Sequence, residues 1–230
     1  MSGIEVRDVV KTYKDVTALD HVSFRLDDGK IYGLLGRNGA GKSTIINIIN
    51  NRIFPDSGQV FIDGEEAMEQ ESAQSKVFCM SEKDLYPKNM RVQKAFWLTR
   101  GFYPEFDEER AREYGERFGL NTKKKIGELS TGYRSIFKLI VALSLDLPYI
   151  FFDEPVLGLD ANHRELFYKL LLEEFSRKPR TFIIATHLIE EVAGLIEDII
   201  IIDKGQVLLQ KPVEELMNEG YSVSGTAAEV

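Results

Sequence analysis

The chain has 230 residues, enough for one large domain or two small ones, and 43% are hydrophobic, so it can bury a substantial core. Its 29 basic and 37 acidic residues give a net charge of −8, which disfavours nucleic acid as a partner but permits a small polyphosphate. Cys79 has no second cysteine to pair with, no leader pattern opens the chain, and no apolar run approaches the roughly 18 to 20 residues that span a bilayer. These features predict a cytosolic protein.

The first part of the chain alternates short strand patterns with turn signals. Strands are predicted over residues 4–9, 19–26 and 31–35, and a helix with isoleucines on one face over 42–51. Shorter strands follow at 59–62 and 76–80. From about 87 to 147 the pattern becomes helical and aromatic, and Asp107 is expected to cap a helix that ends at Gly119. We interpret this region as a helical subdomain inserted into an α/β core.

Three strongly apolar strands are predicted after the insertion, at residues 149–152, 181–185 and 199–202, with a helix at 162–175. Strands that alternate with helices favour a mainly parallel sheet, whereas the first strands indicate an antiparallel β subdomain. The predicted fold class is therefore α/β, with a mainly parallel core, an antiparallel subdomain and the helical insertion. Residues 1–217 are expected to form a single domain and residues 218–230 a polar tail.

A glycine-rich loop lies between the predicted strand 31–35 and the predicted helix 42–51. Residues 36–43 fit G-x-x-x-x-G-K-[ST], in which glycines let backbone N–H groups turn towards phosphate oxygens at a helix N-terminus. Lys42 would reach the β- and γ-phosphates, and the Ser43 hydroxyl would bind Mg²⁺. A glycine turn that merely connects strand to helix is the structural alternative. The residues expected to contact the nucleotide here are Gly36, Arg37, Asn38, Gly39, Ala40, Gly41, Lys42, Ser43 and Thr44.

Two acidic residues follow the predicted strand 149–152. Asp153 and Glu154 come after four large apolar residues, at the carboxyl end of a strand, where open α/β sheets bind ligands. Asp153 suits a hold on Mg²⁺, and Glu154 suits a base that orients and deprotonates an attacking water. For Glu154 alone an exposed turn residue would be the simpler interpretation. The nearby phosphate loop favours the catalytic one.

Further motifs complete a pattern of order and spacing that resembles the ATP-binding cassette of ABC transporters, from about residue 4 to 217. The pattern consists of the phosphate loop, Leu129-Ser130-Thr131-Gly132-Tyr133, Asp153-Glu154-Pro155, Gly158-Leu159-Asp160 and His187. The resemblance implies a P-loop NTPase of ABC type that hydrolyses ATP with Mg²⁺. It also implies that residues 129–133, the signature segment, close over the γ-phosphate held by a second cassette. The family's Leu-Ser-Gly-Gly-Gln is changed here to Thr131 and Tyr133 at its third and fifth places.

The signature residues Leu129, Ser130 and Gly132 would therefore serve the partner's ATP. The Ser130 hydroxyl, the Gly132 amide and the dipole of the apolar helix that follows could all face a phosphate. A plain helix cap at Ser130 is the alternative. Asp160 would contact the opposite subunit in the family, and it is also placed to cap the next helix.

The resemblance assigns roles to two more single residues. His187 takes the family's switch position, where it would contact the γ-phosphate and help orient Glu154 and water. Tyr13 matches the aromatic residue that stacks on adenine, and a plain strand-end tyrosine is the alternative.

The family glutamine that joins the core to the helical subdomain is missing. Its place falls on Ser81, with Glu82 one residue later. A glutamate there could still serve Mg²⁺ or water, and the sequence leaves open which of the two residues takes that role.

Residues 102–107 and 123–126 resemble one bacterial branch, the cassettes of peptide, lantibiotic or antibiotic exporters whose permeases are separate chains. This resemblance implies a peripheral subunit at the cytoplasmic face of the cell membrane. It would pair with a second ABC ATPase, identical or paralogous, and would touch the membrane only through an integral permease. A soluble ABC-type ATPase that regulates ribosome or DNA-repair machinery is the alternative. Such proteins usually carry two cassettes or a long coiled-coil insertion, and this chain shows neither.

Four aromatic residues of the helical region admit two interpretations. They either line a groove for a helix of the permease or form the core of the helical subdomain. The four are Phe96, Trp97, Phe102 and Tyr103.

Overall fold

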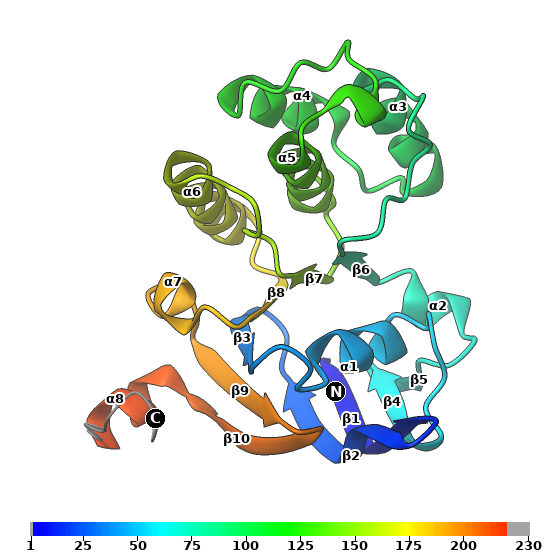
Figure 1. Ribbon diagram of the computed structural model, residues 1–230, viewed down its shortest axis with the longest axis vertical. Coiled ribbons are helices and arrows are strands. Elements are labelled where there is room, and N and C mark those ends of the chain that lie inside the picture. The colour runs from blue at the N-terminus through cyan, green and yellow to red at the C-terminus, as the bar shows by residue number, and fades with distance from the viewer. Residues whose placement is uncertain (1, 220–230) are drawn as a thin grey trace.

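A computed structural model describes residues 2–219, and within them the strands form two sheets (Figure 1). The antiparallel sheet has the order β2-β1-β4-β5, with β1 (Ile4–Tyr13), β2 (Val16–Leu26), β4 (Ser57–Ile62) and β5 (Glu65–Glu66). The larger sheet has the order β10-β9-β3-β8-β7-β6, with β3 (Ile31–Leu35), β6 (Val77–Met80), β7 (Tyr149–Asp153), β8 (Thr181–Thr186), β9 (Asp198–Asp203) and β10 (Gln206–Pro212). Its strands run parallel except β10, which confirms the expected α/β architecture.

The helices fall into two groups. Those outside the helical region are α1 (Lys42–Ile49), α2 (Glu71–Gln74), α6 (Ala161–Arg177), α7 (Ile189–Val192) and α8 (Val213–Glu219). Between β6 and β7 come α3 (Val92–Phe102), α4 (Glu108–Arg117), the 3-10 turn η1 (Ile126–Glu128) and α5 (Thr131–Leu143), which gather at the top of Figure 1. The limits 1–217 and 218–230 stay predictions, because most of the proposed tail lies outside the described residues.

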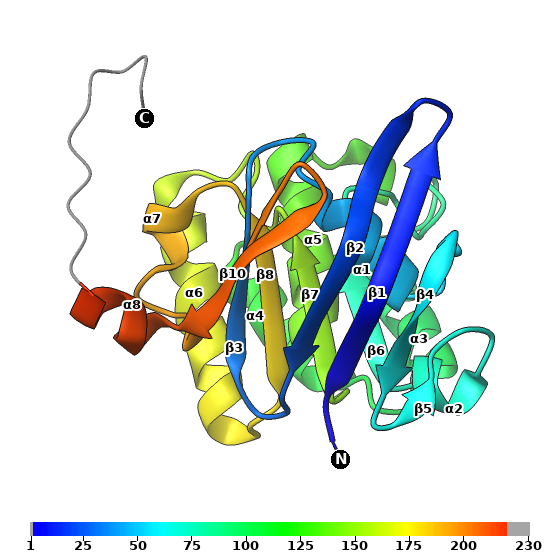
Figure 2. The same cartoon turned by 90° about the horizontal axis from the view of Figure 1, so that it is seen from below.

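The strands β3, β6, β7 and β8 of the larger sheet are buried on both faces, as their apolar residues predict. Alternate residues such as Phe78 and Phe152 pack towards α5 and α6, and their neighbours Cys79 and Phe151 pack towards α1 and the antiparallel sheet. In Figure 2 the antiparallel sheet lies on the near side and α5 lies behind it. The carboxyl ends of β3, β7 and β8 are therefore held in place by two separate cores.

Three predicted helix caps are present. Asp107, Ser130 and Asp160 are the N-cap residues of α4, α5 and α6, and each side chain accepts a hydrogen bond from the backbone N–H three residues on. The helix α4 ends two residues before Gly119, whose φ of 65° suits glycine. These local signals set where α5 and α6 begin, and both beginnings lie next to the site described below.

The four aromatic residues of the helical region divide between core and surface. Phe96 is 1% exposed, and Tyr103 packs edge-on against Phe78 with ring centroids 5.7 Å apart. Trp97 is 63% and Phe102 is 73% exposed. The groove interpretation is therefore wrong for Phe96, which fills the core of the helical region, whereas Trp97 and Phe102 remain open to a partner.

A partly buried network of ion pairs fastens the helical region to α6 and to the start of β8. One carboxylate oxygen of Asp146 lies 2.8 Å from Arg110, 2.6 Å from Arg177 and 2.6 Å from Arg180. Glu174, 1% exposed, pairs with Arg180 at 2.7 Å. Burial acts to raise the pKa of Asp146, but the arginines outweigh it and lower the pKa to about 2. The network anchors the C-terminal end of α5.

Candidate active site

The phosphate loop joins β3 to α1 in a conformation that requires glycine. Gly41 has a φ of 113°, and a Cβ there would lie 2.8 Å from the backbone oxygen of Ala18. The loop returns directly into the first turn of α1, so its N–H groups and the positive end of the helix dipole face the same space. This is the geometry that binds phosphate groups.

Lys42 is the first residue of α1, and its side chain turns back into the loop. Its ammonium donates hydrogen bonds to the backbone oxygens of Gly36 (2.6 Å) and Arg37 (3.2 Å), and it lies 3.5 Å from a carboxylate oxygen of Glu154. Lys42 is 5% exposed, so the charge is held by these contacts in a place of low dielectric. A phosphate that enters the loop meets a buried cation within the loop itself.

Asp153 ends β7 opposite the start of α1. The Ser43 hydroxyl donates a hydrogen bond to a carboxylate oxygen of Asp153 over 3.1 Å. Burial raises the pKa of Asp153 above its ordinary value, and the charges of Glu154 and Glu82 add to the rise, against the opposing effects of Ser43 and Lys42. A cation at these oxygens would relieve the crowding of negative charge.

The chemistry of this donor set fits Mg²⁺. Among residues 2–219 no group of three or more His, Cys, Asp or Glu side chains converges on one point. The protein therefore offers a hydroxyl and a carboxylate beside the phosphate loop, and the remaining ligands are left to phosphate oxygens and water. Mg²⁺ is usually held in this way, by one or two protein oxygens together with substrate phosphates.

Glu154 stands one residue beyond β7 in a left-handed backbone conformation, with a φ of 48°. Its N–H donates to the backbone oxygen of Ala185 (2.9 Å), which ties the turn to the end of β8. Its carboxylate lies 3.0 Å from Nδ1 of His187 and 3.4 Å from the Thr186 hydroxyl. Because β7 and β8 are adjacent and parallel, their carboxyl ends bring Glu154 and His187 together.

The phosphate loop separates two hollows. A cavity of about 390 Å³ is lined by Ala18, Asn38, Gly39, Ala40, Gly41, Lys42, Ser43, Thr44, Asn47, Ser81, Glu82, Lys83, Asp153 and Glu154. On the other side of the loop a hollow of about 730 Å³ contains Gly36, Arg37 and His187. Tyr13 is absent from the described lining of both; it lies 47% exposed at the end of β1, so its contact with adenine stays a prediction.

Ser81 and Glu82 both reach the 390 Å³ cavity, and they differ in their partners. The guanidinium of Arg52 donates to the Ser81 hydroxyl (3.2 Å) and to the backbone oxygen of Cys79 (3.0 Å). Glu82 is exposed, and its charge is felt at Asp153. The Cys79 thiol itself is buried, and burial raises its pKa to about 12.

The signature residues lie outside both hollows. Ser130 is exposed at the start of α5, and its hydroxyl accepts from the N–H of Tyr133 at 3.2 Å. Gly132 approaches the segment before α6 closely, since a Cβ there would lie 3.0 Å from the backbone oxygen of Gly158. Leu129 is buried at 6% exposure. The structure thus brings the phosphate loop, the paired acids and His187 together, and of residues 129–133 it places Thr131 in a neighbouring hollow of about 230 Å³ that Asp153 and Glu154 also line.

Several residues at the site escaped the sequence prediction. Asn47 lines the cavity, and its position one turn after Ser43 on the same helix is a signal that could have indicated it. Ala18 and Arg52 come from a hairpin and from the loop after α1. No local pattern announces them, because their contacts are made across the fold.

The fold and the site together define a P-loop nucleoside triphosphatase. A family model described as "ABC transporter" matches residues 19–157. The chain is 29% identical to the ABC transporter ATP-binding protein YtrB of Bacillus subtilis (strain 168), over 94% of this chain and 74% of that protein. It is 30% identical to the Nod factor export ATP-binding protein I of Rhizobium etli, over 95% of this chain and 71% of that one.

Solved structures agree at the level of the fold. The structure of an ATP-binding subunit of an ABC transporter superposes with a TM-score of 0.85 at 23% identity, covering 95% of this chain and 93% of that one. A dimeric cassette bound to ADP and Pi superposes with a TM-score of 0.81 at 24% identity, covering 91% and 98%. The chain belongs to the ABC transporter family. It is an ATP-binding subunit that hydrolyses ATP, which confirms the expected activity.

Proposed function

We propose that two cassettes close head to tail around two ATP molecules, each bound between the phosphate loop of one cassette and the signature segment of the other. The separation of the two half-sites in one chain supports this arrangement. Among the described residues, the 390 Å³ cavity at Lys42 contains no signature residue, the neighbouring hollow at Glu154 contains Thr131, and Ser130 is exposed at the start of its helix. Neither half encloses a triphosphate by itself, so a second subunit is needed to complete the cage.

Glu154 is proposed as the base that takes a proton from the attacking water, and the observation that carries this proposal is its position between Lys42 and His187. A carboxylate fixed at 3.0 Å from an imidazole and 3.5 Å from an ammonium is oriented before the substrate arrives. His187 would hold that orientation and meet the γ-phosphate, and Lys42 would turn from Glu154 towards the phosphates.

Ser43 and Asp153 would hold Mg²⁺, with Glu82 or Ser81 turned towards its water ligands. The ion, when bound, neutralises charge that develops on the β- and γ-phosphate oxygens. Glu82 is the better placed of the two candidates, because the Ser81 hydroxyl already accepts a hydrogen bond from Arg52. We therefore assign the role of the missing glutamine to Glu82.

Glu154→Gln tests the catalytic assignment. The amide keeps the shape of the side chain and loses the basic oxygen, so ATPase activity should fall by about 100-fold or more while ATP still binds. Size-exclusion chromatography with ATP and Mg²⁺ should then show a trapped dimer. Glu116→Gln, at an exposed position of α4, is the matched control and should behave as wild type. Wild-type turnover by Glu154→Gln, or a monomer with ATP, would contradict the proposal.

The ATPase is proposed to drive a separate membrane permease that exports a peptide, toxin or antibiotic. Among residues 2–219 no helix combines the length and apolar character needed to cross a membrane. Relatives named for export and for import both resemble the chain, since the Nod factor export protein and the methionine import protein MetN of Staphylococcus haemolyticus match over 95% and 93% of it. The direction of transport therefore rests on the resemblance of residues 102–107 and 123–126.

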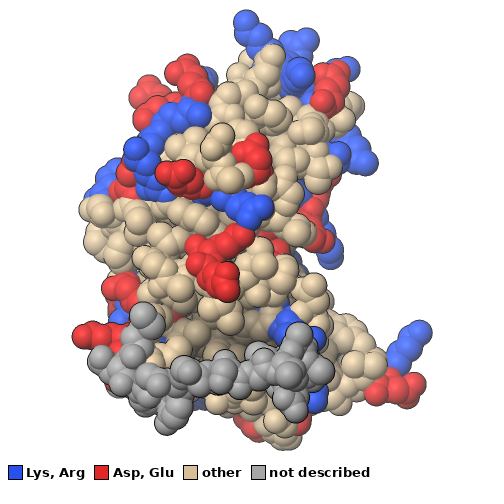
Figure 3. Space-filling model, turned by 60° about the vertical axis from the view of Figure 1, so that its left-hand side comes forward, with Lys and Arg blue, Asp and Glu red and all other residues tan. Residues whose placement is uncertain are grey.

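The exposed aromatic residues Trp97 and Phe102 are the proposed contacts with the permease at the cytoplasmic face of the membrane. On the face shown in Figure 3, basic and acidic side chains are interspersed over the helical region, without a continuous basic surface for nucleic acid. Purification of the tagged chain from detergent extract of its own cells tests the assignment. Recovery of an integral membrane protein supports transport, and recovery of ribosomes or DNA instead would overturn it.

A further inference from the structure

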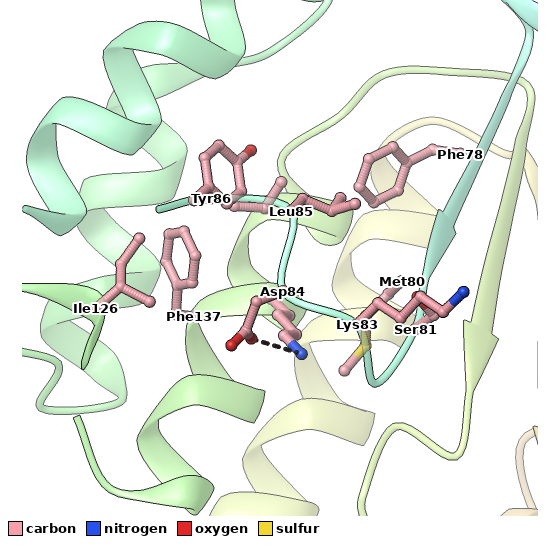
Figure 4. Close-up of a pocket in the computed structure, with 11 residues that line it drawn as sticks. Phe78, Met80, Ser81, Lys83, Asp84, Leu85, Tyr86, Ile126 and Phe137 are labelled. Carbon is pink, nitrogen blue, oxygen red and sulfur yellow. Dashed lines mark ion pairs between the residues drawn. The ribbon is translucent and has the colours of Figure 1, made fainter. Parts of the chain in front are cut away.

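The segment of residues 81–86, which leaves β6 for the helical region, is held from two sides. Arg52, which follows α1, binds Cys79 and Ser81 at its beginning. Lys138 on α5 binds it further along. Its ammonium donates to the backbone oxygen of Glu82 and lies 3.1 Å from a carboxylate oxygen of Asp84. The dashed line at Asp84 in Figure 4 marks this ion pair.

Lys138 lies on the signature helix α5 and lines a hollow that residues of the ATP site also line. It lies two turns along α5 from Ser130, the N-cap at which the signature helix starts. Its side chain is 16% exposed and lines a hollow of about 230 Å³ together with Glu82, Asp153, Glu154 and Thr131. Lys138 and Arg134, both on the helix of the signature segment, therefore line the same hollow as the carboxylates of the chain's own ATP site, and of these two cations Lys138 binds residues 81–86.

We propose that Lys138 is a positioning residue that couples the two ATP half-sites of one chain. Its ammonium binds the backbone oxygen of Glu82, the residue assigned to the Mg²⁺ site of the chain's own ATP. Lys138 also lies on α5, the helix whose first turn would contact the partner's ATP. A shift of residues 81–86 on nucleotide binding then moves the start of α5, and closure on the partner's ATP moves Glu82 in return. This inference rests on the proposed function, because it assumes that the two half-sites belong to different ATP molecules.

The proposed coupling depends on one ammonium group that contacts two acceptors of residues 81–86. When a partly buried ammonium donates to both a carboxylate and a carbonyl oxygen, the interaction is stronger and more directional than an exposed ion pair. The contact with the carbonyl of Glu82 fixes the backbone from which that side chain projects, and the contact with Asp84 holds the segment two residues further on. Loss of the ammonium should therefore misplace Glu82 without removing it, which lowers the rate of hydrolysis more than the affinity for ATP.

Lys138→Met tests the coupling, since methionine keeps the aliphatic stem and removes both contacts. We expect kcat for ATP hydrolysis to fall about tenfold, KM for ATP to change less than about twofold, and the Hill coefficient for ATP to fall towards 1. Lys138→Arg, which donates to both acceptors, should recover kcat to within about threefold of wild type. Lys94→Met, an exposed lysine of α3 in the same helical region, is the matched control and should leave all three quantities unchanged.

Hydrogen exchange gives a readout that needs no turnover. In the nucleotide-free protein, the amides of residues 81–86 should exchange faster in Lys138→Met than in wild type or Lys94→Met, and more slowly again in Lys138→Arg. Should Lys138→Met fail to fold, Asp84→Asn takes its place, with a smaller effect because the contact with the carbonyl of Glu82 is kept.

Unchanged exchange in residues 81–86, or a fall in kcat that Lys138→Arg does not reverse, would overturn the coupling. An unchanged Hill coefficient in Lys138→Met would do so too. These outcomes differ from failure of the catalytic assignment, which is read from Glu154→Gln alone. If Glu154→Gln is active, Glu154 is not the base. If Lys138→Met nevertheless shows faster exchange in residues 81–86, the contact of Lys138 with that segment still stands.

Discussion

The two halves of the proposed ATP site differ in how completely one chain builds them. At the phosphate loop, Lys42 is 5% exposed and bonded to the loop backbone, and Glu154 is fixed by contacts from three directions. At the signature, the hydroxyl of Ser130 is exposed and accepts a hydrogen bond from its own helix. The first half is organised before ATP arrives, whereas in the proposed dimer the second would gain its ligand only when two chains meet.

The largest effect on ATPase activity is expected from two variants, each of which disables one half of the site. Lys42→Ala removes the cation of one half and Ser130→Ala the hydroxyl of the other, and each should lower ATPase activity by about 100-fold. When the two inactive proteins are mixed, a head-to-tail dimer of two different variants has one intact site. Up to about a quarter of the wild-type rate should then return, because about half of the dimers are mixed and each has one working site of two, and coupling between the sites would lower this share.

Ser130→Thr is the control for that experiment, since threonine keeps a hydroxyl and a cap, and its activity should stay within a fewfold of wild type. No recovery on mixing would contradict pairing between two copies of this chain. Recovery only after a paralogous cassette is added would identify a heterodimer.

An effect of intermediate size, on stability, is expected at the C-terminal end of α5. The ion pairs of Asp146 anchor the helix there. The pKa of Asp146 is lowered from 3.8 to about 2, so its stabilising effect is complete above pH 4 and is lost as the pH falls towards 2. Asp146→Asn should lower the free energy of unfolding at pH 7 by about 2 kcal/mol. Urea unfolding at several pH values checks this: the gap between wild type and variant should close in acid, and a gap that is constant with pH would contradict it.

The smallest effect, on the KM for ATP, is expected at Tyr13, which is exposed at the end of β1. If Tyr13 stacks on adenine, Tyr13→Ala removes about 1 kcal/mol of binding, and KM for ATP should rise about fivefold with kcat unchanged. Tyr13→Phe keeps the ring and should match wild type. Equal KM values for all three proteins would leave Tyr13 as a plain strand-end residue.

Features carried by neighbouring residues were predictable from the sequence. The phosphate loop, the acids after β7 and the caps Asp107, Ser130 and Asp160 each depend on a few consecutive positions, and the structure places them in the expected elements. The parallel core followed from apolar strands separated by helices. These signals are local or periodic, so a single sequence contains them.

Features made by distant residues were not predictable. The short helices α2 and α7 carry too few residues for a clear period, and the edge strand β10 is half-exposed and lacks the apolar run of the inner strands. The strand β1 extends to Tyr13 because its polar end pairs with β2. Nothing near Lys138 in the chain indicates that it binds residues 56 and 54 positions earlier, Glu82 and Asp84. The fold also had to be known before Phe96 and Trp97, which are adjacent, could be assigned to core and surface.

The burial of Cys79 has a practical consequence. It is the single cysteine among 230 residues, and its thiol is 1% exposed with a pKa of about 12, so very little reactive thiolate forms near neutral pH. The folded protein should therefore ignore maleimide and spin-label reagents. A cysteine introduced at any exposed position becomes a unique attachment point, and the opening and closing of two subunits can be followed by distance measurements without first removing a native thiol.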